Sequence, residues 1–121
     1  MSLDLVAAIA GKALDGLFAR QTATADNIAN AGSPGFAPVR VSFEEALRSA
    51  ALSQPGDSIT GSMNRIAAVT PRVETPLSDQ LDGVKLDREI TTASETSARY
   101  AMLIGMLDRT LQMQQLAVKG A

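Results

Sequence analysis

Carboxylates are the only residues in this sequence whose type and pairing suggest acid-base chemistry. Glu44 and Glu45 are adjacent, and one residue separates Asp87 from Glu89. Neither spacing puts two carboxylates on the same face of a helix, so both pairs are expected to be solvated charges. Histidine and cysteine are absent, which removes the usual general base near neutral pH and most transition-metal ligands.

A third acidic pair, Asp79 and Asp82, comes just before Gly83 and raises the question of a calcium site. The alternating oxygen ligands and the closing glutamate of a calcium loop are not present around it. No glycine-rich phosphate loop occurs, and no base, nucleophile and orienting group form a set. The sequence therefore predicts a protein that is not an enzyme and that uses no cofactor, metal or small-molecule substrate.

Composition limits the partners. The 121 residues include 11 basic and 13 acidic side chains spread singly along the chain, so a nucleic-acid partner is not expected. The apolar runs are too short to cross a bilayer, so no membrane span is expected. The amino terminus carries Asp4 and no basic run before its short hydrophobic stretch, unlike a cleavable secretory signal.

The positions of the five prolines divide the chain into segments that would position any functional residue. All five lie between two proline-free ends. We expect a helix over residues 1–31, a turn, a short extended piece and a short helix over 32–51, a flexible loop over 52–83 and a second long helix over 84–121. The expected fold is mainly α, with the two terminal helices packed as an antiparallel, coiled-coil-like hairpin and an irregular, loop-rich middle.

The first segment carries a heptad stripe that becomes polar near its end. Its members are Leu3, Ala7, Ala10, Leu14, Leu17, Gln21, Thr24, Ile28 and Ala31. Gly11 and Gly16 each cost about 1 kcal/mol of helix propensity relative to alanine. The isolated helix is therefore expected to be marginal, and packing must stabilise it.

Several local signals mark the expected boundaries of the middle elements. The first helix should end near Asn30, with Gly32 as a left-handed cap. Residues 39–43 alternate between apolar and polar types, which predicts a brief extended piece. Ser42 and Glu45 have the spacing of a capping box that opens a short helix. Residues 52–83 show no sustained period, which favours a loop with at most one weak hairpin.

The last segment has the clearest periodicity. One heptad stripe contains Leu86, Ile90, Ala93, Ser97, Tyr100, Ile104, Leu107, Leu111, Gln114 and Val118. Asp82 or Asp87 is expected to cap the start of this helix. Met102, Met106 and Met113 add a soft surface beside the stripe, suited to packing against several partners.

The most specific motif lies at the end of the first segment: Asn27, Ile28, Ala29, Asn30, Pro34, Gly35 and Phe36. It resembles the amino-terminal signature of flagellar rod and hook proteins, which runs Asn, aliphatic, Ala or Ser, Asn, then Pro-Gly-aromatic. Gly32 stands where Asn or Asp is usual, Ser33 where Thr is usual and Phe36 where Tyr is usual.

A second resemblance lies at the carboxyl end. Residues 84–90, followed by Ala98, Arg99 and Tyr100, look like the proximal rod subfamily FlgB, with FlgC as a close competitor. Together the two resemblances cover residues 1–45 and 84–121, and the middle matches no pattern.

The resemblance implies a structural subunit of the bacterial flagellar basal body. Such a subunit is exported unfolded by the type III apparatus, without a cleaved signal peptide. It then joins the periplasmic rod, the tubular drive shaft that transmits torque for motility, by self-assembly through coiled-coil-like terminal helices. The implied partners are copies of itself, the rod proteins FlgC and FlgF, and the ring-to-rod adaptor FliE.

Two structural alternatives remain open from the residues alone. The motif either closes a turn inside one subunit or also contacts a neighbour. The two stripes either cover only each other or form an assembly seam, which we assign to Leu14, Leu17, Ile28, Ile90, Tyr100, Ile104, Leu107 and Leu111. Apolar residues outside the stripes favour assembly, because they would leave exposed patches on a solitary copy.

A functional alternative from another class is a soluble export chaperone or adaptor built as a helical hairpin. It would use the methionine-rich last helix as a groove and would need no polymer. Circular dichroism separates the two, because a rod subunit is expected to show low helicity when dilute, whereas a chaperone is already folded.

Overall fold

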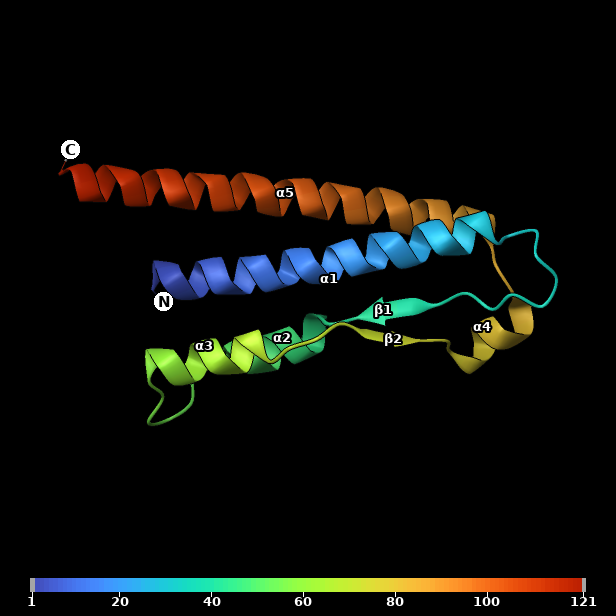
Figure 1. The fold of residues 1–121 in the computed structure, drawn as a ribbon, viewed down its shortest axis with the longest axis horizontal. Helices are drawn as coiled ribbons and strands as arrows, with labels where there is room; N and C mark the ends of the chain where they lie inside the picture. Colours follow the sequence, from blue (N-terminus) through green and yellow to red (C-terminus); the bar gives the residue numbers. More distant parts are fainter. Residues whose placement is uncertain (1, 121) are drawn as a thin grey trace.

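The structure, a computed structural model, describes residues 2–120 as three layers (Figure 1). In order, the elements are α1 (Leu3–Ala29), β1 (Arg40–Ser42), α2 (Glu44–Ala51), α3 (Ile59–Ala67), β2 (Arg72–Glu74), α4 (Leu77–Asp82) and α5 (Leu86–Lys119). Helix α1 is the middle layer. Helix α5 covers one side of it, and α2, α3 and the β1–β2 ribbon cover the other.

The two long helices lie side by side and run in opposite directions. Both chain ends are found at the same end of the molecule, where α5 extends beyond the start of α1 (Figure 1). The predicted mainly helical fold, with long terminal helices packed on each other and a loop-rich middle, is confirmed.

The boundaries of α1 follow from its caps. The Ser2 hydroxyl accepts a hydrogen bond from the Leu5 amide at 3.2 Å, which satisfies one of the free donors of the first turn. The helix gives way at Asn30, as predicted. The prediction for Gly32 is wrong, because the positive φ, 75°, belongs to Gly35. Turn hydrogen bonds continue past Asn30, and the Phe36 amide donates to the Ser33 carbonyl at 3.2 Å across Pro34 and Gly35.

The extended piece is confirmed as β1, which pairs antiparallel with β2 and aligns Val41 with Val73. The predicted capping box of Ser42 and Glu45 is wrong. Ser42 belongs to β1, so α2 begins after Phe43, which caps it without a side-chain hydrogen bond. The Glu44 carboxylate accepts from the Phe43 amide at 3.4 Å instead.

The expectation that residues 52–83 lack regular structure is wrong, although loops join the elements found there. Helix α3 starts at a Ser58 cap, whose hydroxyl accepts from the Gly61 amide at 3.0 Å. Its Ile66 side chain is buried, which gives this short helix a tertiary anchor. Helix α4 ends at Gly83, and α5 begins after Lys85 with no side-chain cap, so neither Asp82 nor Asp87 has the predicted capping role.

A small aliphatic and aromatic core lies between α1 and the β1–α2–α3 layer. Its buried members are Leu17, Val41, Phe43, Leu47, Ile66 and Val69. The Phe43 ring lies directly against Gly16, where an added Cβ would overlap the ring atoms. Gly16 therefore lowers helix propensity but makes room for the largest core side chain.

Candidate assembly surface

Asn27, the first residue of the signature motif, is fully buried and joins three parts of the chain. Its amide nitrogen donates to the Val39 carbonyl at 2.9 Å, and its amide oxygen accepts from the Val39 amide at 2.9 Å. The same nitrogen donates to the Glu89 carboxylate at 3.0 Å. Asn27 thus closes the turn after α1 within one chain and also attaches α5.

Glu89 has no exposed surface and lies at the centre of a charged group. Its other carboxylate oxygen is 2.6 Å from the Arg40 guanidinium, which also binds Asp79 at 2.9 Å. Arg88 binds the second oxygen of Asp79 at 3.1 Å. The prediction that Glu89 is a solvated charge is therefore wrong, and Asp79 pairs with two arginine side chains. We call Asn27, Arg40, Asp79, Arg88 and Glu89 the polar cluster.

The pKa values in the polar cluster reflect a balance between burial and pairing. Burial lowers the pKa of Arg40, but hydrogen bonds and negative charge from Asp79 and Glu89 together outweigh that effect. The pKa of Arg40 is therefore raised. Burial raises the pKa of Asp79, but hydrogen bonds and positive charge from Arg40 and Arg88 outweigh that effect, and its pKa is lowered. Both groups are therefore held in their charged forms.

The remaining motif residues have different surroundings. The Asn30 side chain donates to the Asp26 carbonyl at 2.9 Å, so it satisfies a terminal helix carbonyl. Ile28 and Phe36 are half-buried. Ala29, Pro34 and Gly35 are exposed, the first at the end of α1 and the other two in the turn that follows it. The motif therefore performs an internal closure at Asn27 and leaves its Pro-Gly turn accessible.

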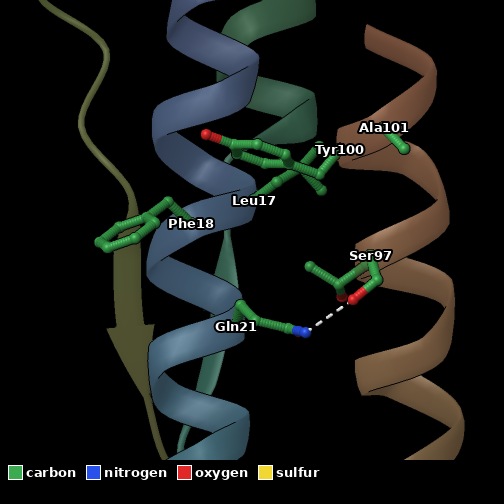
Figure 2. Close-up of a pocket in the computed structure, with 7 residues that line it drawn as sticks. Leu17, Phe18, Gln21, Ser97, Tyr100 and Ala101 are labelled. Carbon is green, nitrogen blue, oxygen red and sulfur yellow. Dashed lines mark hydrogen bonds between the residues drawn. The ribbon is translucent and has the colours of Figure 1, made fainter. Parts of the chain in front are cut away.

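Polar groups also dominate the next two turns of the contact between α1 and α5. The Gln21 side chain donates to Ser97 Oγ at 2.9 Å and to the Ala93 carbonyl at 3.3 Å (Figure 2). Thr24 on α1 and Thr96 on α5 are both buried. The Thr24 hydroxyl donates to the Arg20 carbonyl of its own helix, so in these turns the bonds from Gln21 to α5 limit how far α5 can slide along α1.

The side of α5 that faces α1 lies about one residue earlier than the predicted stripe. Glu89, Leu103 and Thr110 are less exposed than Ile90, Ile104 and Leu111, the residues that follow them. Of the other assembly-seam residues, Leu17 is buried, Leu14, Ile28 and Leu107 are half-buried, and Tyr100 is just above one-third exposed. The polar partners of Glu89 and Gln21 rotate the aliphatic stripe of α5 partly away from α1.

This rotation leaves α5 with two exposed apolar flanks. One, the aliphatic stripe, consists of Ile90, Ile104, Leu111 and Val118, which share a face because multiples of seven separate them. The other, the methionine ridge, consists of Met102, Met106 and Met113, each more than half exposed. Apolar surface of this extent on one helix is typical of a protein contact.

Two grooves follow the contact between α1 and α5 on either side of Leu17. The first, the aromatic groove, has a volume of about 350 Å³ and is lined by Leu17, Phe18, Gln21, Ser97, Tyr100 and their neighbours (Figure 2). The second, of about 200 Å³, is lined by Phe43, Arg99, Met102 and Leu103 among others. The methionine ridge therefore begins on the side of Leu17 opposite the aromatic groove.

No protein-family model matches the chain, and no curated protein matches it. Within residues 2–120, no helix combines the length and apolar character that crossing a bilayer requires.

Proposed function

We propose that this chain is a structural subunit of the bacterial flagellar basal-body rod, closest in type to the proximal rod proteins. It is not an enzyme in this proposal. It leaves the cell interior through the type III apparatus without a cleaved signal peptide, and it assembles in the periplasmic rod through α1 and α5. Its neighbours are copies of itself, FlgC, FlgF and the adaptor FliE.

The observation that carries the proposal is the exposed apolar surface of α5. The aliphatic stripe and the methionine ridge flank the side of the helix that faces α1 and extend over its last half. Water contact along both flanks is unfavourable, and burial against neighbouring helices removes it, at roughly 25 cal/mol per Å² of apolar area. A subunit surrounded by other helices gains most from this arrangement.

The flagellar assignment itself rests on the signature motif and on the likeness of residues 84–90 and 98–100 to the proximal rod proteins. The internal bonds of Asn27 and the exposed Pro34 and Gly35 are compatible with a motif that ends the first rod helix. Polar contacts fix α5 near its start, while its apolar flanks remain exposed. This arrangement suits a protein that becomes fully ordered when neighbouring subunits cover those flanks.

The test is complementation of a strain that lacks this gene. Ile104→Asp places a charge on the exposed aliphatic stripe, and Leu107→Asp places one on the half-buried side. Both variants are expected to be exported but to abolish rod assembly and swimming, since a carboxylate buried between helices has no partner. Motility in soft agar and the amount of rod in purified basal bodies measure the effect.

Leu81→Asp is the matched control, because Leu81 is an exposed leucine on the short helix α4. It should support normal swimming. A deletion strain that swims normally and has intact rods would contradict the rod assignment. Normal rods in the Ile104→Asp strain would exclude the α5 surface as the assembly contact.

A further inference from the structure

The two sides of the α1–α5 pair differ in chemistry. On one side, the aromatic groove has two rings at its rim, with Phe18 66% exposed and Tyr100 37% exposed. On the other side, the methionine ridge projects three flexible thioether side chains from α5. Leu17 lines both grooves, so the ridge and the aromatic groove face opposite directions on one molecule.

The ridge and the groove suit each other as contact surfaces. Methionine adapts to irregular apolar space, and its sulfur makes favourable contacts with aromatic rings. The ridge also carries charged side chains, since Arg99 lies beside Met102 and Arg109 follows Met102 by seven residues. The exposed Glu95 precedes Met102 by seven residues and lies on the same face.

The net charges at the edges of the two surfaces are opposite in sign, because the ridge has two arginines against one glutamate. Asp15 lies on the face of α1 that carries Phe18, three residues away, and Asp108 lies on the face of α5 that carries the groove residue Ala101. Arg99 and Arg109 accompany the ridge. Among residues 2–120, Asp15 and Arg109 make no ion pair, and Arg99 has only a long contact of 3.7 Å to Glu44.

We propose that the occupant of the aromatic groove is the methionine ridge of a second copy of this chain. The contact is head-to-tail, because each copy uses its groove toward one neighbour and its ridge toward the next. A heterologous contact of this kind leaves a free groove and a free ridge at the ends, so it continues into a ring or a helical tube. The inference rests on the proposed structural function and specifies which surfaces meet.

The test uses two full-length variants with one defective surface each. Phe18→Asp damages the groove and Met102→Asp damages the ridge, and both side chains are more than 60% exposed, so the fold of one copy should persist. In sedimentation velocity, the unchanged chain should form large species as its concentration rises. Each variant alone should remain monomeric at concentrations at least tenfold higher.

Mixing the two variants gives the decisive result. The intact ridge of Phe18→Asp can still enter the intact groove of Met102→Asp, so the mixture should form one-to-one dimers that grow no further. Leu81→Asp should associate like the unchanged chain. Circular dichroism at a common low concentration checks that the variants match the unchanged chain in helicity.

Three results would overturn the inference: an unchanged chain that stays solitary, a mixture that forms no dimer, or a groove variant that still associates while only the ridge variant fails. The last result would indicate ridge-to-ridge pairing. The complementation experiment separates these failures from that of the rod assignment. A solitary chain whose deletion still abolishes rods would leave the assignment intact, with another rod protein as the occupant.

Discussion

The two sides of α1 are covered in different ways. Toward α2, α3 and β1, the contact is apolar, with Phe43 against Gly16 and Ile66 among the buried core residues. Toward α5, the buried groups are mainly polar, and Asn27, Glu89 and Thr96 are each almost or entirely inaccessible. The apolar side resembles an ordinary protein core, whereas the α5 side is held by a few specific hydrogen bonds and ion pairs.

The difference indicates what each layer contributes. Apolar burial stabilises without setting a precise register, while buried hydrogen bonds and ion pairs are favourable only in one alignment. The β1–α2–α3 layer therefore stabilises α1 by apolar burial, and the polar contacts set the position of α5 along α1. With its alignment fixed in this way, α5 can leave its aliphatic stripe and methionine ridge available for other copies.

The strongest test of this contrast removes the centre of the polar cluster. Glu89→Ala would leave Arg40 with only Asp79 and would take one acceptor from the buried amide of Asn27. Losing one partner of a buried ion pair costs about 3 kcal/mol or more in the free energy of unfolding. Urea unfolding followed by circular dichroism measures the loss.

Two further variants separate the causes of that loss. Glu89→Gln keeps an acceptor for Asn27 but removes the charge that Arg40 needs, so its cost should be smaller than that of Glu89→Ala. Glu95→Ala removes an exposed carboxylate from the same helix, and its effect should stay within about 0.5 kcal/mol. A Glu89→Ala chain as stable as Glu95→Ala would show that the polar cluster does not hold α5.

The apolar side can be tested with a matched pair of glycines in α1. Gly16→Ala would force a Cβ into the Phe43 ring, so the expected net loss is about 1 to 3 kcal/mol despite the better helix propensity of alanine. Gly11→Ala has no atom within 4 Å of the new Cβ and should stabilise the chain by up to about 1 kcal/mol. Equal effects at both positions in thermal unfolding would contradict the close packing of Phe43.

Features set by local periodicity were predictable from the sequence. Proline-free ends with sustained heptads predicted α1 and α5, and the alternation over residues 39–43 predicted β1. The helices and strand within residues 52–83 were missed because each has fewer than ten residues and gains its stability from tertiary contacts, such as the burial of Ile66.

The polar cluster was not predictable from spacing alone. The spacing of Asp87 and Glu89, which puts the two carboxylates on different faces of a helix, predicts a solvated Glu89, yet its partners Arg40 and Asn27 lie far away in the chain. Only the antiparallel pairing of α1 with α5 brings these residues together. The same contacts explain the rotation of α5 by about one residue, since an aliphatic stripe predicts which side of a helix is buried only where polar groups do not compete for that side.

The smallest expected effect concerns acid. The pKa of Asp79 is lowered in the fold, so below its ordinary pKa of about 4 the unfolded chain binds more protons than the folded one. The stability from this carboxylate is therefore complete above about pH 4 and is lost as the pH falls through the folded pKa, at about 1.4 kcal/mol per unit of lowering. Asp79→Asn should be less stable than the unchanged chain at pH 6, and this difference in stability should shrink toward pH 3 in urea unfolding.

Some acid sensitivity should remain in Asp79→Asn, because hydrogen bonds from Arg20 lower the pKa of Glu44 as well. Asp15→Asn, which removes an exposed carboxylate outside the polar cluster, is the matched control. If the difference in stability between Asp79→Asn and the unchanged chain did not vary with pH, the negative charge of Asp79 would not be what stabilises the polar cluster.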